Sequence, residues 1–166
     1  MDGVKPNDTP EVPGLEPIFR HLDDVPWQQV RTQMHPEGQR SVWEKWLSFH
    51  RDPPYLSLYA RYDPGMVVRR HGHYSNHVVF VLRGEILCGD VPCPTGTHIE
   101  LPLGAAFGPL IAGPAGADLF EVMMGDPRSW GADEAGFERL LRERGIEKLP
   151  DPPIALPDWL EDRRAT

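Results

Sequence analysis

The sequence predicts an all-β fold, an antiparallel sandwich or barrel, followed by a C-terminal helix and an extended tail. From about residue 16 to residue 125, short runs rich in β-branched and aromatic residues alternate with Gly, Pro and Asp, the pattern of antiparallel strands and turns. After Trp130 the pattern becomes that of one amphipathic helix. No repeat at a fixed period is visible, which disfavours a propeller or a solenoid.

Three regions are expected along the chain. Residues 1–15 are polar and rich in proline and carry little that a core could bury, so a flexible arm is expected there. Residues 129–166 are expected to form the helix and the tail, packed on the barrel or on a partner subunit. Residues 16–128 form the barrel between them, and its strand candidates are the runs 42–49, 55–62, 66–70, 77–82, 97–101 and 118–124.

The helix is expected within residues 132–145. Its apolar residues Phe137, Leu140 and Leu141 share one face, acidic residues occupy the first turn and arginines the last, and Gly145 is the expected stop. In the proline-punctuated tail that follows, Trp159 and Leu160 are candidate anchors to the barrel surface or to a neighbouring subunit.

Charge and composition limit the classes of function. The net charge of −8 and the lack of any Lys/Arg-rich run argue against nucleic acid and anionic membranes as partners, because both attract a positive surface. No stretch approaches 18 consecutive apolar residues, and the N-terminus does not resemble a signal peptide. A cytoplasmic protein whose partners are small molecules or other proteins is therefore expected.

The two cysteines, Cys88 and Cys93, are expected to be free thiols. A two-residue turn at Gly89 and Asp90 would pair Cys88 with Val91 rather than with Cys93.

Three histidines lie within seven positions in the stretch "HGHYSNH", residues 71–77. Alternation along a strand projects His71 and His73 the same way, and a turn at residues 74–76 would reverse the chain and bring His77 opposite them. Three neutral imidazoles suit Fe(II), Zn, Cu, Mn or Ni and leave positions open for water, substrate or dioxygen. The alternative is a set of exposed turn histidines, or a core histidine satisfied by hydrogen bonds.

The same residues carry a resemblance to a known family. Gly65, His71, His73 and Gly84 have the spacing of the first motif of the cupin superfamily, in which the position held here by His77 is usually glutamate. The stretch "GTHIELPLGAAF", residues 96–107, resembles the second motif, with Phe107 at the position of the usual fourth ligand, a histidine. A weaker likeness is to the branch that contains 2,4'-dihydroxyacetophenone dioxygenase and the anti-sigma-factor cupins.

The resemblance implies a jelly-roll barrel with one divalent metal ion in its mouth, held by His71, His73 and His77. Three-histidine iron centres in cupin-like enzymes are associated with the cleavage of diketones, phenolic ketones and thiols by dioxygen, so Fe(II) is favoured over Zn, Mn or Ni. Phe107 in place of the fourth ligand leaves an open site, which suits catalysis. It is equally compatible with a degenerate, metal-free barrel.

Glu100 and His98 are candidates for a fourth ligand or a general base. If Pro102 pairs with Phe107 across a four-residue loop, period-2 alternation puts both side chains on the face of Phe107. In the alternative register, Ile99 and Leu101 face the core while His98 and Glu100 meet solvent.

Three residues are candidates for the substrate pocket. Arg69 shares the parity of His71 and His73, so it should face inward and pair with a buried carboxylate such as Glu121 or with an anionic substrate. Tyr59 is a candidate of second rank, and Phe107 would narrow and dry the mouth.

Three functions remain open at this stage. The first is a mononuclear non-haem Fe(II) dioxygenase that acts on a small oxygenated substrate and O2. The second keeps the site but uses Zn, Mn or Ni as a Lewis acid in a lyase, isomerase or cyclase. The third is a non-catalytic ligand-binding barrel, since one fold hosts all three. A homodimer is expected.

Overall fold

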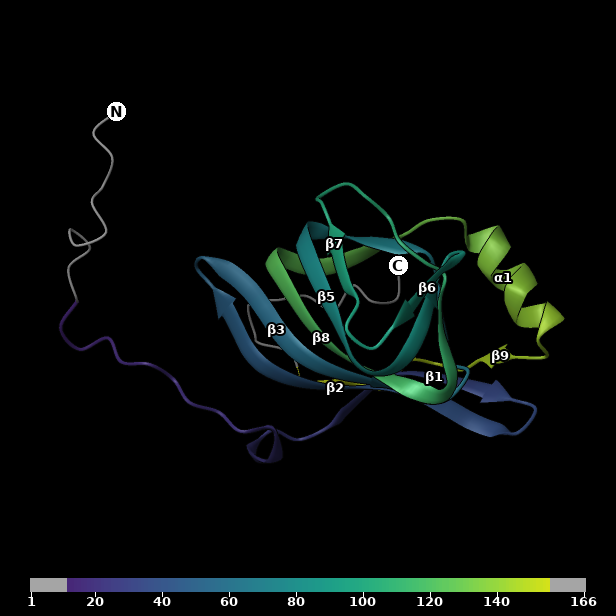
Figure 1. Ribbon diagram of the computed structural model, residues 1–166, viewed down its shortest axis with the longest axis horizontal. Helices are drawn as coiled ribbons and strands as arrows, with labels where there is room; N and C mark the ends of the chain where they lie inside the picture. Colours follow the sequence, from purple (N-terminus) through teal and green to yellow (C-terminus); the bar gives the residue numbers. More distant parts are fainter. Residues whose placement is uncertain (1–11, 156–166) are drawn as a thin grey trace.

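The computed structural model describes residues 12–155 and shows an all-β molecule with one α-helix at its C-terminal end (Figure 1). All strand pairs are antiparallel, as the sequence predicts. The elements are η1 (Leu22–Asp24), β1 (Gln28–His35), β2 (Gly38–Arg51), β3 (Pro54–Tyr62), β4 (Val67–Val68), β5 (His71–Cys88), β6 (Val91–Pro94), β7 (His98–Leu101), β8 (Leu110–Gly131), α1 (Glu134–Glu143) and β9 (Glu147–Lys148).

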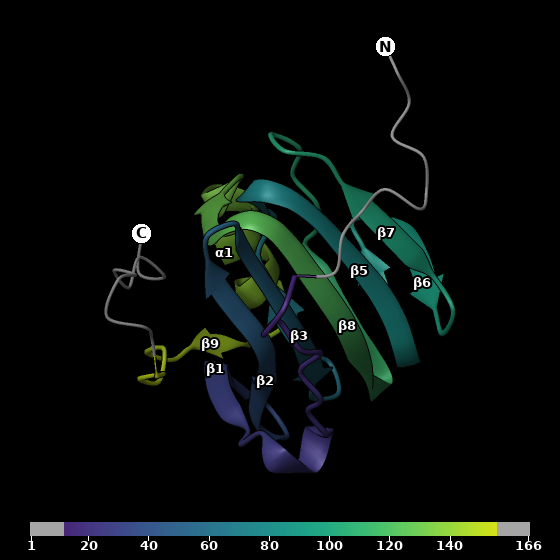
Figure 2. The ribbon, with the colours of Figure 1, turned by 90° about the vertical axis from the view of Figure 1, so that its left-hand side faces the viewer.

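The strands form one strongly curved sheet in the order β6-β5-β8-β3-β2-β1-β9, with β7 paired to β5 and β4 paired to β8. Figures 1 and 2 show the sheet curling around its own inner face, with β2 and β3 on one side and β6 and β7 on the other. The longest strands, β5 and β8, pair along their whole length and form the spine of the barrel.

Two glycines allow β5 and β8 to bend. Gly84 and Gly116 have φ values of +69° and +72°, and a Cβ on Gly84 would lie 2.0 Å from the carbonyl oxygen of Gly116. The register shifts beside Gly84, which marks a bulge. The runs 77–82 and 118–124 are therefore parts of longer strands, because glycines that predict breaks act here as bends within a strand.

Strand β1 has no clear signature in the sequence because several of its inward residues are polar. Gln33 is buried, and its side chain donates to the carbonyl of Val67 at 2.6 Å and accepts from the Val67 amide at 3.3 Å. Hydrogen bonds thus allow polar side chains to be buried in β1, and its sequence therefore lacks the alternation of apolar and polar residues that identifies a strand.

The C-terminal helix packs on the barrel as its pattern predicts. Phe137 and Leu141 of α1 are buried with Val67 and Ile146, and Gly145 follows the helix with φ +64°. Beyond α1, the chain runs back along β1, where the Leu149 amide donates to the Thr32 carbonyl. The candidate anchors Trp159 and Leu160 lie outside the described residues.

Two smaller expectations concern the cysteines and membranes. Cys88 pairs with Val91 across the turn, and both cysteines are free thiols, as predicted. Within residues 12–155, no helix is both long and apolar enough to cross a membrane.

Candidate metal centre

The three histidines come from one continuous strand. His71, His73 and His77 all lie on β5, so the expected turn at residues 74–76 is wrong. That segment stays extended because it pairs with β8 throughout, from His71 with Gly131 to His77 with Met123. Odd-numbered positions of this segment share one face, which gathers the three imidazoles without a hairpin.

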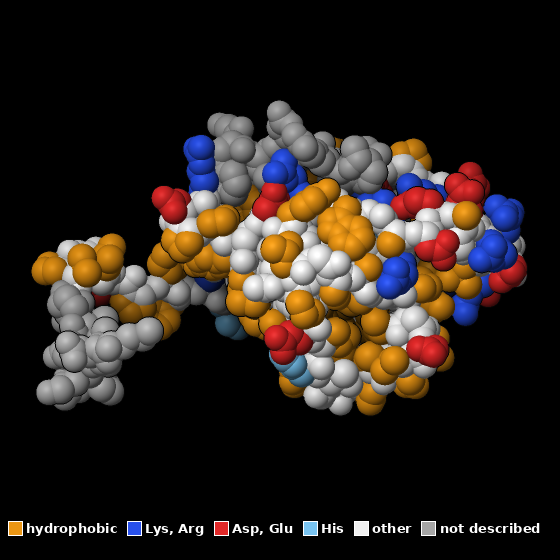
Figure 3. All heavy atoms as spheres, turned by 90° about the horizontal axis from the view of Figure 1, so that it is seen from above, with side chains coloured by type: hydrophobic (Ala, Val, Ile, Leu, Met, Phe, Trp, Pro, Cys, Tyr) orange, Lys and Arg blue, Asp and Glu red, His pale blue; other side chains and the backbone are white. Residues whose placement is uncertain are grey.

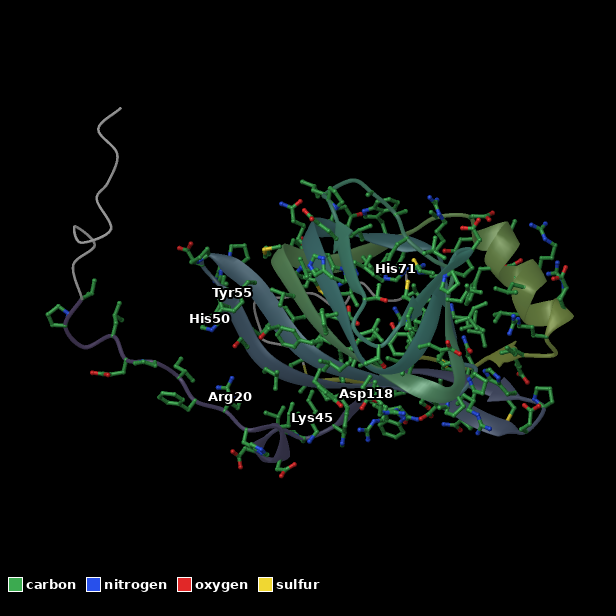
Figure 4. All side chains as sticks on the ribbon, in the orientation of Figure 1. Arg20, Lys45, His50, Tyr55, His71 and Asp118 are labelled. Carbon is green, nitrogen blue, oxygen red and sulfur yellow. The ribbon has the colours of Figure 1, made fainter. Side chains whose placement is uncertain are left out.

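The imidazole rings are in mutual contact inside the barrel. Ring centres are 5.1 Å apart for His71 and His73 and 4.6 Å apart for His73 and His77. Two imidazoles bound to one metal through nitrogens about 2.1 Å from it have ring centres roughly 4.5 to 5 Å apart. Figure 4 places His71 within the curve of the sheet.

Two of the histidines already expose the nitrogen that a metal needs. The Nδ1–H of His71 donates to the Arg69 carbonyl, and the Nδ1–H of His73 donates to the Pro127 carbonyl, both at 2.8 Å. These bonds fix the tautomer and leave a lone pair on each Nε2, as in most metal-binding histidines.

Both histidines are held in the neutral form. Burial, and next the neighbouring His73, lowers the pKa of His71 to about 3. Burial, and next His77, lowers the pKa of His73 to about 4. At neutral pH both rings are therefore uncharged, which is the state that binds a metal.

His77 is completely buried and is bound to Glu121. Its Nε2 lies 2.9 Å from Oε2 of Glu121, while its Nδ1 has no hydrogen-bond partner among the described residues. With Nε2–H donating to the carboxylate, the lone pair of His77 is on the orphaned Nδ1.

Glu121 is the functional candidate whose role the sequence analysis missed. The sequence suggests it only as a possible partner for Arg69, whose Nη1 lies 3.0 Å from Oε1 of Glu134 on α1, whereas Glu121 contacts His77. The available signal was an acidic residue at an inward position of the apolar run 118–124. Its contact with His77 follows from the pairing of β5 with β8, which no local pattern specifies.

The donor set fits a divalent metal, although it is not assembled around one point. Among residues 12–155, no three His, Cys, Asp or Glu side chains already form a metal-ligand cluster. The fit rests on two fixed Nε2 lone pairs, from His71 and His73, and on a buried, unpartnered nitrogen of His77 beside them. An orphaned buried nitrogen is costly and calls for a partner.

The other fourth-ligand candidates face away from the histidines. His98 and Glu100 are exposed, whereas Leu101 is buried opposite His77. The register that would turn them inward, with Pro102 paired to Phe107, is not the observed one, since Phe107 bridges His71 through two backbone hydrogen bonds. The alternative register, with Ile99 and Leu101 inward, is the one observed.

Phe107 lies beside the histidines as expected. Its ring centre is 4.9 Å from that of His71 and 5.6 Å from that of His77, and its side chain is buried. An aromatic ring in this position contributes no ligand and keeps water away from one side of the imidazoles.

A cavity of about 320 Å³ opens next to the centre. His71, His73 and Glu121 contribute to its wall, so the two fixed imidazoles and the carboxylate face the same space. This volume is at the lower end of the range for small-molecule sites. The other wall residues include Tyr62, Met123, Phe137, Arg31, Arg69 and Glu134.

Tyr59 is on the opposite face of the sheet from this cavity. Leu56, Leu58 and Ala60 of β3 are buried inward, so Tyr59 points outward, where its hydroxyl donates to Asp118. The pocket role expected for Tyr59 is therefore wrong, and the inward tyrosine of this strand is Tyr62.

Comparison with known proteins identifies the fold. No family model matches the sequence, and no curated protein matches it. Solved structures do match. The polyketide cyclase RemF from Streptomyces resistomycificus is 20% identical, with a TM-score of 0.57 over 75% of this chain and 93% of that one.

Two further structures agree. A protein assigned as an acetylacetone dioxygenase, from Methylibium petroleiphilum PM1, is 12% identical, with a TM-score of 0.56 over 75% of this chain and 94% of that one. An RmlC-like cupin from Ralstonia eutropha JMP134 is 14% identical, with a TM-score of 0.51 over 80% of this chain and 93% of that one. This chain therefore has the cupin fold, the jelly-roll barrel that its two motifs imply.

Proposed function

We propose that this chain is a mononuclear metal-dependent enzyme, a non-haem Fe(II) dioxygenase that cleaves a small oxygenated substrate of the diketone or phenolic ketone type. In this proposal His71, His73 and His77 hold the metal. The observation that carries it is the cluster of three imidazoles, of which His73 and His77 are buried and His71 is half-buried. In His71 and His73, Nδ1 is bonded to a carbonyl and Nε2 is directed elsewhere. Fe(II) held by these three residues would supply the redox chemistry through which dioxygen reacts with an enolate or phenolate substrate.

The protein's own contribution begins with the neutral charge of its ligand set. Three imidazole ligands are neutral, so they do not offset the positive charge of a divalent metal as a carboxylate ligand would. The remaining positive charge favours binding of an anionic oxygen of the substrate. Glu121 lies behind His77 and contacts it through one hydrogen bond.

The cavity walls orient the substrate and restrict water. Met123 and Phe137 supply the apolar wall. Phe107 lies outside the wall and covers His71 and His77 from another side. The guanidinium of Arg69, positioned by Glu134, lies on the same cavity and supplies a positive group toward a carbonyl or enolate oxygen.

The test of this proposal is oxygen consumption by protein reconstituted with iron under anaerobic conditions. β-Diketones and hydroxyacetophenones should each be offered to the wild-type chain, to His73→Ala and to His98→Ala. We expect oxygen uptake by the wild type and by His98→Ala, because His98 is exposed and outside the cavity. No uptake by iron-loaded wild type across the substrate panel would contradict the dioxygenase assignment.

A second candidate is Lewis-acid chemistry with Zn, Mn or Ni in a lyase, isomerase or cyclase. The observation that favours it is Glu121, a buried carboxylate on the cavity wall that can accept a substrate proton. The cupin fold accommodates both classes, since it is shared with proteins named as a dioxygenase and as a polyketide cyclase. Turnover that persists without oxygen in zinc- or manganese-loaded protein would favour this candidate.

The third candidate, a ligand-binding barrel without catalysis, would bind small molecules in the cavity and turn over none of them. Calorimetric binding of a panel compound by protein that lacks all activity would support it.

A further inference from the structure

The wall of the cavity beside the histidines contains a buried tyrosine to which the proposed reaction assigns no role. Tyr62 ends β3, is 6% exposed and shares the wall with His71, His73 and Glu121. Alternation along β3 turns it to the inner side of the sheet, together with the buried Leu58. Its side chain therefore faces the space in which a substrate would bind.

The hydroxyl of Tyr62 has no hydrogen-bond partner within residues 12–155. On the same strand, by contrast, the hydroxyl of Tyr59 donates to Asp118. A buried tyrosine normally pairs its hydroxyl, because an unpaired polar group inside a protein is costly. A molecule in the cavity can provide the partner that these residues do not.

This hydroxyl acts as a hydrogen-bond donor. Burial, and next the carboxylate of Glu121, raises the pKa of Tyr62 well above its ordinary value. At neutral pH the group is therefore an uncharged O–H. Such a donor binds an oxygen with a free lone pair, as in a ketone, an ether or a hydroxyl group.

The charges on the cavity wall disfavour a negatively charged group next to Tyr62. Both arginines of the wall are already bound to carboxylates of this chain, in the pairs Arg31–Asp151 and Arg69–Glu134. The third basic wall residue, Lys148, is exposed and therefore solvated. The carboxylates of Glu121 and Glu44, in contrast, both act on the Tyr62 hydroxyl.

The surface formed by α1, next to the cavity, is also of mixed charge. Figure 3 shows acidic and basic side chains side by side at the end of the molecule where α1 lies. The helix contains residues of both signs, namely Glu134, Glu138, Arg139, Arg142 and Glu143. Its Phe137 lines the cavity. A surface of mixed sign does not steer a strongly charged ligand as a patch of one sign does.

Tyr62 and the histidines approach the cavity from different places along the barrel. Tyr62 pairs with Ala117 of β8, whereas His77 pairs with Met123, further along the same strand. Because each residue of a strand adds about 3.3 Å, these two positions are well separated. A ligand that contacts both Tyr62 and the histidines must therefore carry polar atoms at two separate positions.

We propose that Tyr62 determines which substrates this cavity accepts, by donating a hydrogen bond to an uncharged acceptor oxygen away from the oxygen directed at the histidines. The substrate class is then a small neutral molecule with two separate oxygen functions. A cavity of about 320 Å³ suits a molecule of that size. This inference deepens the proposed function and rests on its choice of the cavity as the substrate site.

Binding of three related probes to the wild-type chain and to Tyr62→Phe tests this role. The probes are acetophenone, para-methoxyacetophenone, which adds an uncharged acceptor oxygen, and para-acetylbenzoate, which adds a carboxylate. Calorimetric titration under nitrogen, with metal-free and with zinc-loaded protein, measures dissociation constants that do not depend on turnover. We expect the wild type to bind the methoxy probe about fivefold more tightly than the other two, and Tyr62→Phe to lose this preference over acetophenone.

Tyr59→Phe is the matched control, because it removes a hydroxyl from the opposite face of the same strand. It should keep the preference of the wild type among the probes, although it loses its hydrogen bond to Asp118. Urea unfolding adds a second measurement. Tyr62→Phe should be at least as stable as the wild type, because its hydroxyl has no partner to lose, whereas Tyr59→Phe should be less stable.

An unchanged preference in Tyr62→Phe, a preference of the wild type for para-acetylbenzoate, or binding of none of the probes would overturn this role. Oxygen uptake by iron-loaded protein decides the proposed reaction separately, because the probes are compared without iron or oxygen. A preference that Tyr62→Phe abolishes, in a chain that consumes no oxygen, would support the role of Tyr62 and contradict the dioxygenase.

Discussion

At the scale of single residues, His77 and Glu121 are the least conventional part of the candidate centre. The first cupin motif usually has a glutamate at position 77, where this chain has a histidine. A carboxylate is nevertheless close by, because Oε2 of Glu121 on the neighbouring strand lies 2.9 Å from Nε2 of His77. Glu121 therefore orients His77, and in the proposed metal centre it would set the basicity of that imidazole.

Replacing Glu121 with leucine tests this role. The change leaves the Nε2–H of His77 buried without an acceptor, which should cost about 1–3 kcal/mol of the free energy of unfolding. Metal affinity should fall by about 10- to 100-fold, whereas Glu121→Gln, which keeps an acceptor oxygen, should lose less. Urea unfolding and metal titration provide the two measurements.

The control for this pair is Glu100→Leu, which removes an exposed carboxylate on the outer face. Equal loss of metal affinity in the Glu121 and Glu100 variants would show that the contact with His77 has no special role.

The residue-scale predictions from sequence succeeded where strand alternation alone decides the geometry. His71 and His73 share a face because they are two positions apart. Phe107 lies beside His71, as its place in the second cupin motif implies. The sequence misplaces Tyr59, misses the role of Glu121 and leaves two orientations open for His98 and Glu100, because each depends on which strands pair and in which register. Hydrogen bonding between distant segments sets that register, and a local pattern does not contain it.

At the scale of elements, the pairing of β5 with β8 carries both the three histidines and Glu121. Both strands are longer than their apolar runs suggest, because Gly84 and Gly116 let them curve without ending. The sequence identified the strands and the helix from composition and periodicity. From the sequence alone, β5 and β8 are predicted as shorter strands, because glycine and proline are common both in turns and at bulges within a strand.

Gly84→Ala tests the close approach of the two strands. An alanine there would adopt an unfavourable positive φ and place its Cβ 2.0 Å from the Gly116 carbonyl oxygen. Gly96→Ala is the matched control, because Gly96 also has positive φ but has nothing within 4 Å of its added Cβ. We expect about 1–2 kcal/mol of destabilisation for Gly96→Ala and clearly more for Gly84→Ala, measured by urea unfolding. Similar values for both would mean that the strands do not meet closely there.

At the scale of the whole molecule, a charge cluster around the buried Asp118 joins three strands on the face opposite the cavity. Asp118 of β8 accepts hydrogen bonds from Arg61 and Tyr59 of β3 and from Arg83 of β5. Burial by itself would raise the pKa of Asp118, but these hydrogen bonds outweigh burial and hold the pKa below its ordinary value. Figure 4 places Asp118 on the lower side of the barrel, below His71.

This cluster predicts a specific dependence of stability on pH. Because the pKa of Asp118 is lower in the folded state than in the unfolded state, its stabilisation is present above about pH 4 and is lost as the pH falls below that value. Asp118→Asn should therefore be less stable at pH 7, by about 1–3 kcal/mol, and should lose less stability than the wild type between pH 4 and pH 2. Parallel stability curves for the two proteins would refute this.

Elemental analysis of protein that is expressed without a polyhistidine tag and purified anaerobically tests the central claim most directly. We predict about one metal ion per chain, chiefly iron, retained by His98→Ala and lost by His77→Ala. Zinc, manganese or nickel at that level would instead shift the assignment to Lewis-acid chemistry. A metal-free chain that takes up no added iron, zinc or manganese, or equal metal retention by the two variants, would contradict a metal centre built on His71, His73 and His77.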